Sequence, residues 1–306
     1  MRRRASLALA LAVLLSGFQL SAQQDSNNVS QVLKKAQNGD AEAEFALGRD
    51  YRKGLGVTRD YAQAARWFTA AAAQGSAAAQ FELGYLYEKG QGVERNNARA
   101  VELYRISAQQ GHATAANNLG AMYERGLGVV KSSADAIQWY RVAAERGDAT
   151  GQCNLAQIYF LGEGVRRDYQ EAARWFRAAA EQGLPAAENE LAYLYYMGSG
   201  LSQDYAEAAK WKRRAADQGY AHAMTDLGYL YEHGKGVGLD YAEAYMWYRR
   251  GAEAGDSRAV EQMRSLSGVM TSKQLLEAKT RASTWMPSSN DGTADEMGGE
   301  FAAPKH

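Results

Sequence analysis

The chain of 306 residues carries 35 basic and 35 acidic side chains, so its formal charge is zero, and 46% of its residues are hydrophobic. This balance argues against nucleic acid as a partner, because nucleic-acid-binding surfaces are strongly basic. The single cysteine, Cys153, excludes an internal disulfide, so side-chain packing must stabilise the fold.

Residues 1–22 have the pattern of a secretory signal peptide. Three arginines precede an apolar run from Ala5 to Leu15 that is too short to cross a bilayer, and small residues follow at Ser21 and Ala22. We therefore expect cleavage after Ala22 and a mature protein in the periplasm or outside the cell. No cysteine stands near this junction to accept a lipid anchor, and no later stretch is apolar enough for an integral membrane segment.

Residues 39–254 repeat six times with a period of 36 residues and no insertion or deletion. A period of this length indicates a solenoid, in which each unit buries its apolar face on its neighbours. Residues 23–38 precede the array and are expected to form an N-terminal cap, with Val29, Val32 and Leu33 in a polar segment. The period is marked by a glycine at Gly39, Gly75, Gly111, Gly147, Gly183, Gly219 and Gly255.

The sequence pattern of each repeat predicts two helices. In the first helix, apolar residues recur at spacings of three and four, as at Ala79, Leu83 and Leu86, which places them on one face. A pair of glycines follows and suits a left-handed helix end and a tight turn. The second helix opens with a capping residue and carries a tryptophan in most repeats, which is expected to fill the space between helices. The capping residues are Asp60, Asn96, Ser132, Asp168, Asp204 and Asp240, and the tryptophans are Trp67, Trp139, Trp175, Trp211 and Trp247.

The C-terminal part departs from the repeat. Residues 255–286 predict a C-terminal helical cap, made of one repeat-like helix and an unrelated second helix through Leu275, Leu276 and Ala278. Beyond Pro287 the chain is rich in Gly, Ser, Asp and Glu, so residues 287–306 are expected to be a disordered tail.

The motif A-x-A-x-x-x-L-G-x-x-Y, then G-x-G-V, then D-Y-x-x-A-x-x-W-[FY]-x-x-A-A, resembles the Sel-1-like repeat, a relative of the tetratricopeptide repeat, over residues 39–254. The resemblance implies an all-α, right-handed superhelical solenoid of antiparallel helix pairs that acts as an adaptor in multiprotein assemblies. It also implies a link to envelope complexes, signalling or host contact, and no catalytic residues. The departures from the motif are Ala156 and Ala192 for the glycine after leucine, Leu103 for tryptophan, and Lys212 for the aromatic residue after Trp211.

Function is expected on the first helices, which usually line the concave face of such solenoids. The rows of residues that flank the leucine row vary between repeats, whereas the core rows do not, and variation on a fixed scaffold is typical of a recognition surface. The competing interpretation is that these positions are solvated or pack between repeats. The predicted partner-binding residues are the aromatic anchors Tyr85, Tyr193 and Tyr229, the polar residues Asn117, Asn118, Asn154 and Gln157, and the acidic residues Glu190 and Asp226.

No catalytic site, cofactor or metal is predicted. Of the four histidines, His222 and His233 stand eleven residues apart, roughly 16 Å along a helix, which is too far to share a metal ion. The sequence has no zinc-binding motif, nucleophile elbow or phosphate loop. A lone cysteine such as Cys153 is expected to be a buried core residue.

Three functions remain open from the sequence. The first is a non-enzymatic, exported, monomeric adaptor that binds a protein segment or peptide. The second is a peptidoglycan- or β-lactam-directed enzyme, by analogy with secreted cysteine-rich relatives that place a cysteine pair in each repeat, whereas this chain has only Cys153. The third is an inhibitor that holds a membrane sensor or enzyme inactive, which differs from the first only in its consequence.

Overall fold

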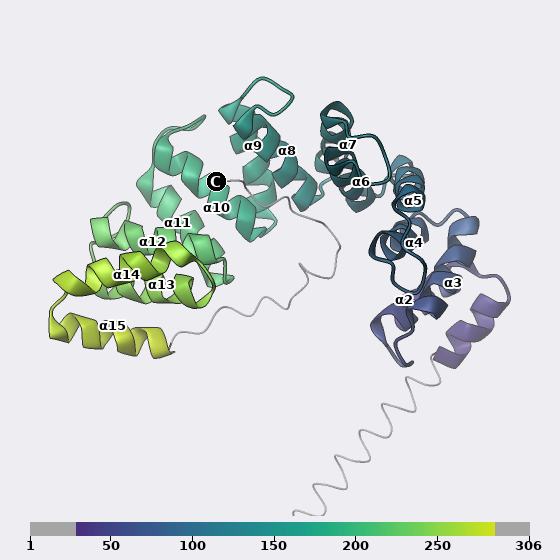
Figure 1. Cartoon of the computed structure of the whole chain (residues 1–306), viewed down its shortest axis with the longest axis horizontal. Helices are drawn as coiled ribbons and strands as arrows, with labels where there is room; N and C mark the ends of the chain where they lie inside the picture. The colour runs from purple at the N-terminus through teal and green to yellow at the C-terminus, as the bar shows by residue number, and fades with distance from the viewer. Residues whose placement is uncertain (1–28, 285–306) are drawn as a thin grey trace, which may run out of the picture. The chain divides into compact units, whose positions relative to one another are not determined.

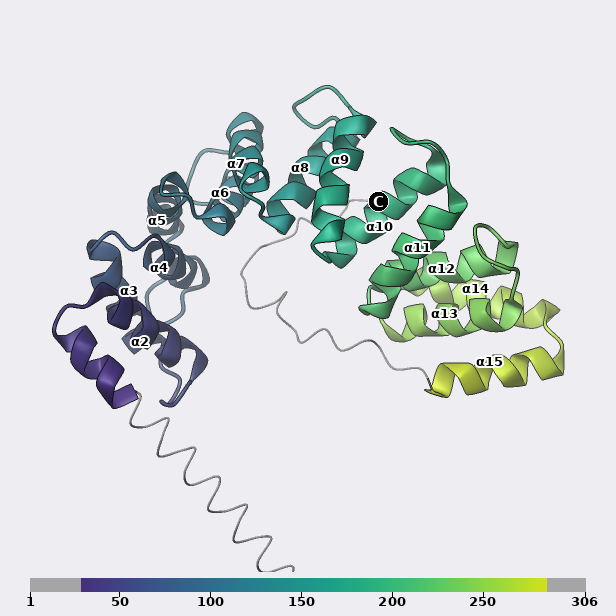
Figure 2. The ribbon, with the colours of Figure 1, turned by 180° about the vertical axis from the view of Figure 1, so that it is seen from behind.

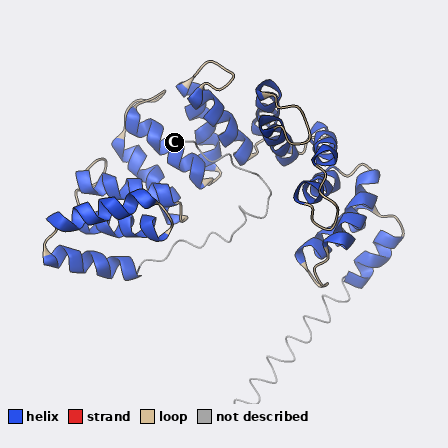
Figure 3. Ribbon diagram, in the orientation of Figure 1, coloured by secondary structure: helices blue, strands red, loops and turns tan. Residues whose placement is uncertain are grey.

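The computed structural model describes residues 29–284, which form helices joined by short turns without any strand (Figures 1 and 3). The expected all-α fold of tandem helix pairs is confirmed for these residues. The signal peptide predicted at residues 1–22, the start of the N-terminal cap and the tail at residues 287–306 lie outside the described residues.

Six helix pairs make up the repeats, and two further helices follow them. A short helix over residues 29–37 precedes the array, where Val29, Val32 and Leu33 pack against Ala43 and Leu47. The pairs are α2 (Ala41–Lys53) and α3 (Tyr61–Ala73), α4 (Ala77–Lys89) and α5 (Asn97–Gln109), α6 (Ala113–Arg125) and α7 (Ser133–Glu145), α8 (Ala149–Leu161) and α9 (Tyr169–Glu181), α10 (Pro185–Met197) and α11 (Tyr205–Asp217), and α12 (Ala221–His233) and α13 (Tyr241–Glu253), followed by α14 (Ser257–Val269) and α15 (Ser272–Thr284).

The chain divides into two compact units. Of the described residues, the first unit holds 29–115 and 125–131, and the second holds 116–124 and 132–284. In the second unit, α9 to α13 pack in chain order, and α14 and α15 both pack against α13, as the views from the front and from behind show (Figures 1 and 2). No helix in the described part of the chain combines the length and the apolar character needed to span a membrane.

Side-chain caps start the second helix of every repeat, as the sequence predicts. Asp60 Oδ1 accepts hydrogen bonds from the backbone N–H groups of Ala62 at 2.9 Å and Gln63 at 3.0 Å. These bonds satisfy donors that a helix N-terminus otherwise leaves free. The same capping is made by Asn96, Ser132, Asp168, Asp204 and Asp240.

The turn between the two helices of a repeat presses against the preceding repeat. Gly200 has a φ of +71°, and a Cβ atom there would lie 2.2 Å from the backbone oxygen of Tyr169, at the start of α9. Only glycine fits both the left-handed backbone and this close approach. The same approach to the preceding repeat recurs at Gly92, Gly128 and Gly236.

The core of each repeat centres on the residue after the tryptophan position. In four repeats this residue is aromatic and its ring lies over the glycine of the first helix: a Cβ atom at Gly84 would lie 2.9 Å from the ring of Tyr104. The tryptophans fill less of the interior than expected, because Trp67 and Trp139 are only half-buried. The fully buried rings of the row are Phe68, Tyr104, Tyr140, Phe176 and Tyr248, whereas Lys212 takes this place in the fifth repeat.

The close contact at the turn predicts a difference between two glycine substitutions in the second unit. Gly183 also has a positive φ, of +85°, but no atom lies within 4 Å of its added Cβ. We expect Gly183→Ala to lose about 1–2 kcal/mol for the left-handed backbone alone. Gly200→Ala should lose a further ~1–3 kcal/mol, because the new methyl group overlaps the backbone of Tyr169. Urea unfolding of both variants measures the difference, and equal midpoints would show that the turn does not lock adjacent repeats.

Candidate functional site

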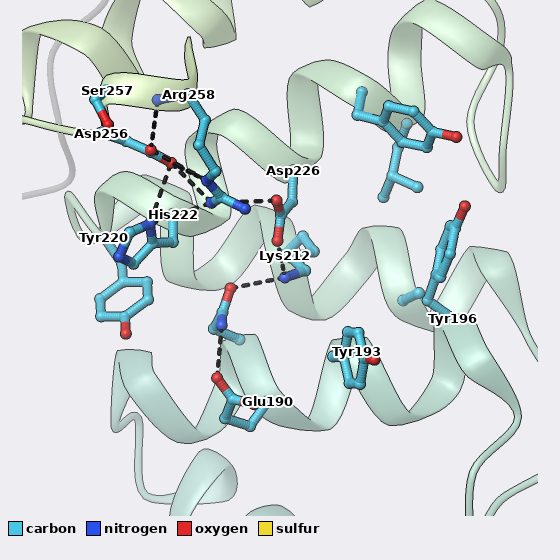
Figure 4. A pocket seen from close by; sticks show the side chains of 14 residues that line it. Glu190, Tyr193, Tyr196, Lys212, Tyr220, His222, Asp226, Asp256, Ser257 and Arg258 are labelled. Carbon is cyan, nitrogen blue, oxygen red and sulfur yellow. Dashed lines mark hydrogen bonds and ion pairs between the residues drawn. The ribbon is translucent and has the colours of Figure 1, made fainter. Parts of the chain in front are cut away.

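A pocket of about 630 Å³ lies in the second unit, between the fifth and sixth repeats and the start of α14. Its charged side chains gather on one side, and Tyr193 and Tyr196 stand on the other (Figure 4). Helices α10, α11, α12 and α14 all contribute. The lining residues are Asn189, Glu190, Tyr193, Tyr196, Ala208, Lys212, Tyr220, His222, Asp226, Tyr229, Leu230, Asp256, Ser257 and Arg258.

Lys212 is the departure from the repeat on which the pocket depends. It stands where other repeats bury an aromatic ring, and only 5% of its surface is exposed. Its Nζ donates a hydrogen bond to Asn189 Oδ1 at 2.7 Å and forms an ion pair with Asp226. A buried ammonium group is tolerated only when it is paired and hydrogen-bonded, so Lys212 requires these polar neighbours.

Arg258 and Asp256, at the start of α14, extend the charged network. Arg258 Nη2 lies 2.8 Å from Asp256 Oδ2 and 3.5 Å from Asp226 Oδ1. Asp256 Oδ2 also lies 3.1 Å from Nδ1 of His222. Burial by itself raises the pKa of Asp256, but hydrogen bonds, first from Arg258 and then from Thr225, outweigh burial and hold that pKa well below its usual range.

Glu190 is the buried carboxyl group of the pocket. Only 3% of its surface is exposed, and its Oε1 accepts a hydrogen bond from Asn189 Nδ2 at 3.0 Å. Among the residues that the structure describes, no Lys, Arg or His forms an ion pair with it. Burial, and after it the Glu190 carboxylate, raises the pKa of Tyr220 to about 12 and that of Cys153 well above its usual value.

Tyrosine rings form the other wall. Tyr193 is 40% exposed, and its ring meets the edge of Phe160 with centroids 6.0 Å apart. Tyr229 stacks on His233 at 4.1 Å and meets Tyr196 edge-on at 6.4 Å. An aromatic wall beside buried charges can bind a ligand that carries both an apolar and a charged part.

The structure brings four of the nine predicted binding residues together in this pocket: Glu190, Tyr193, Asp226 and Tyr229. Tyr85 belongs to the first unit, where it is half-buried and has Lys89 Nζ 5.5 Å from its ring centre.

The asparagines predicted to lie on the binding surface are buried, so this prediction is wrong. Asn117, Asn118 and Asn154 are at most 4% exposed. Asn154 Nδ2 on α8 donates to Asn117 Oδ1 on α6 at 2.9 Å, and Asn117 Nδ2 donates to Asn118 Oδ1 at 3.3 Å. These amides therefore link adjacent first helices, because the residues just before the leucine row turn toward the neighbouring repeat. Gln157 is half-buried, and its Oε1 has no partner among the described residues.

Sequence reasoning missed Lys212, Arg258, Asp256, Tyr220 and Tyr196 as site residues. One sequence feature points to this site: Lys212 stands where the other repeats have an aromatic residue after the tryptophan position. A lysine at a core position indicates a buried charge that needs polar partners. Cys153 is buried, as the sequence predicts. Among residues 29–284, no group of three or more His, Cys, Asp or Glu side chains is arranged to hold a metal ion.

The lowered pKa of Asp256 predicts a pH-dependent stability. Because this pKa is lower in the folded than in the unfolded chain, the ionised group stabilises the fold above the unfolded pKa of about 4, and this contribution is lost as the pH falls below it. We expect Asp256→Asn to lose about 1–3 kcal/mol at pH 7, with the difference from wild type shrinking below pH 4. Urea unfolding at several pH values measures this.

Asp168→Asn is the matched control for that substitution. Asp168 caps α9 but forms no ion pair among the described residues, so the loss should be under about 1 kcal/mol. A difference between Asp256→Asn and wild type that stays constant from pH 7 to pH 2 would contradict the role given to the ionised carboxylate.

The chain also resembles known proteins. It is similar to a Sel1 repeat protein from Oxalobacter formigenes, with 33% identity, a TM-score of 0.67, and coverage of 78% of this chain and 95% of that one. It is also similar to c5321, a protective antigen with an SLR fold from uropathogenic Escherichia coli. The identity is 29% and the TM-score is 0.38, and the match covers 84% of this chain and 71% of that one. A third similar structure is the immunity protein Pa5087 from Pseudomonas aeruginosa. The identity is 20% and the TM-score is 0.44, and the match covers 78% of this chain and 82% of that one.

No curated protein matches the sequence. The model of the Sel1 repeat matches six times without a gap, over residues 41–76, 77–112, 113–148, 149–184, 185–220 and 221–256. These matches cover well over half of the chain and coincide with the six helix pairs. The chain therefore belongs to the Sel1 repeat family.

Proposed function

We propose that this chain is a non-catalytic scaffold that binds a segment of a partner protein in the pocket of the fifth and sixth repeats. Sel1 repeat proteins are generally protein-interaction scaffolds. The observation that carries the proposal for this chain is the pocket itself, where variable residues of α10 and α12 converge on a space of about 630 Å³. This volume lies within the range of ligand-binding pockets, which is large enough to enclose part of an extended segment.

The chemistry of the pocket supports binding more than it supports catalysis. Tyr193 presents an exposed ring, and tyrosine rings are frequent hot spots because they bury a large area with little loss of side-chain entropy. The enzyme hypothesis drew on relatives with cysteine pairs, whereas Cys153 is single, buried and has a raised thiol pKa. A thiol in that state is a poor nucleophile.

We further propose that the protein is exported and works as a monomer in the periplasm or outside the cell, in envelope assembly, signalling or host interaction. The support for export is the arginine-led apolar segment at residues 1–22. Control of a membrane sensor or enzyme is the same binding activity with a different consequence. Cell fractionation together with the mass of the mature chain tests export, and recovery of the uncleaved chain in the cytoplasm would contradict it.

The binding proposal predicts that the tyrosine wall is needed for a partner. The partner is first captured by cross-linking in cells that express the chain, and is then purified. Calorimetry of the full chain with Tyr193→Ala and Tyr229→Ala combined should show about 10- to 100-fold weaker binding, since each ring is expected to contribute about 1 kcal/mol or more.

Tyr85→Ala is the control, because Tyr85 belongs to the first unit and does not line the pocket. Circular dichroism melting of both variants checks that the array stays folded. Weaker binding by the Tyr85 variant alone would move the site away from the pocket, and full affinity in the double variant would also contradict its place there.

A further inference from the structure

We propose that the pocket accepts a basic side chain of the partner, an arginine or a lysine, and that the Glu190 carboxylate binds its charged end. This inference rests on the proposed function and names the chemistry of the segment that the pocket takes. It joins three observations: the charge balance of the pocket, the burial of Glu190 without a cation, and the exposed ring of Tyr193 beside it.

Among the residues that line the pocket, carboxylates outnumber permanent cations by one. Its two permanent cations are Lys212 and Arg258. Lys212 pairs with Asp226, and Arg258 pairs with Asp256 while also lying 3.5 Å from Asp226. Both cations are thus engaged by aspartates, and Glu190 is the carboxylate that remains. An acidic ligand would have to displace one of these aspartates, whereas a basic ligand meets a carboxylate that has no cation.

The neighbouring Glu188 shows what Glu190 lacks. Both residues lie on α10 and both are buried, with exposures of 0% and 3%. Glu188 Oε1 lies 2.8 Å from Nη2 of Arg214, and its Oε2 accepts a hydrogen bond from Gln218 at 2.8 Å. Glu190 has only the Asn189 amide, at 3.0 Å. A buried carboxylate without a cation is unfavourable, so an incoming ammonium or guanidinium group would gain a strong, charge-assisted bond there.

Tyr193 supplies the surface for the aliphatic part of such a side chain. It follows Glu190 by three residues on α10, which places both on one helix face (Figure 4). Its ring is 40% exposed, unlike the rings buried in the core of the repeats. Arginine and lysine stems pack on aromatic faces while their cations reach a carboxylate, and guanidinium groups also stack on the ring.

A library of capped heptapeptides with randomised central positions tests the inference. The full chain, immobilised, is compared with Glu190→Gln and with Glu188→Gln as the matched control. We expect wild type and Glu188→Gln to select arginine or lysine at one position. Glu190→Gln should lose that selection and bind the best basic peptide at least about tenfold more weakly, because a charge-assisted bond is removed.

Melting temperatures separate this role from a structural one. Glu190→Gln removes a buried charge that has no cation, so the variant should melt at the wild-type temperature or above it. Glu188→Gln breaks an ion pair with Arg214 and should melt lower. Weaker peptide binding by a Glu190→Gln chain that also melts well below wild type would overturn the assignment of Glu190 as a binding group.

The outcomes also separate this inference from the proposed function. Selection of acidic or purely apolar peptides that is lost with Tyr193→Ala would overturn the basic-side-chain inference and leave the peptide-binding pocket in place. Selection of basic peptides that persists in Glu190→Gln would show that another carboxylate binds them. No selection of any peptide by the wild-type chain would contradict the proposed function itself.

Discussion

The fold depends on one contact that most repeats share, in which an aromatic ring of the second helix rests on the first helix. The ring of Tyr104 comes so close to Gly84 that a side chain there would overlap it, and the relation recurs between Tyr140 and Gly120. This contact sets the distance between the two helices, because the glycine removes the side chain that would hold them apart. The turn glycines then bring each of their turns against the backbone of the preceding repeat, at Gly92, Gly128, Gly200 and Gly236.

The fifth repeat breaks this rule, and the candidate site follows from the break. Lys212 replaces the ring, and Ala192 replaces the glycine of its own repeat. The ammonium group must be paired where it is buried, which brings Asn189 and Asp226 to it. A core position of the fifth repeat is thus polar, and Lys212, Asn189 and Asp226 all line the pocket. The candidate site thus lies where the fifth repeat departs from the repeat pattern.

Much of the fold could be predicted from the sequence, because its determinants are local and recur every 36 residues. The capping residues, such as Asp60, and the helix pairs follow directly from residue type and spacing. The sequence also singles out Tyr193 and Tyr229, because their row varies on a constant scaffold, and the structure places both rings in the pocket. What periodicity alone cannot determine is the degree of burial. Asn117 and Asn154 look like surface amides in one helix, but stacking of adjacent first helices encloses them.

Hydrogen bonds between the two helices of a repeat are a further part of the fold that the pattern of single residues does not reveal. The hydroxyl of Tyr104 donates to Glu88 Oε2 at 2.7 Å, and that of Tyr248 donates to Glu232 Oε2 at 2.6 Å. The repeat with Phe68 has Arg52 in place of the glutamate, so the two positions change together. Neither residue stands out alone in a single sequence.

The start of α14 in the C-terminal cap is part of the candidate site. Asp256 caps α14 through the backbone N–H of Arg258, and the side chains of these two residues form the outer edge of the charged network. The same Asp256 carboxylate therefore starts α14 and holds the Arg258 guanidinium group near Asp226. In a repeat array, where each unit is stabilised by its neighbours, this arrangement links the order of the terminal cap to the geometry of the pocket. A segment bound beside Lys212 would stabilise the sixth repeat and the cap together, because binding to the folded form shifts the folding equilibrium toward it.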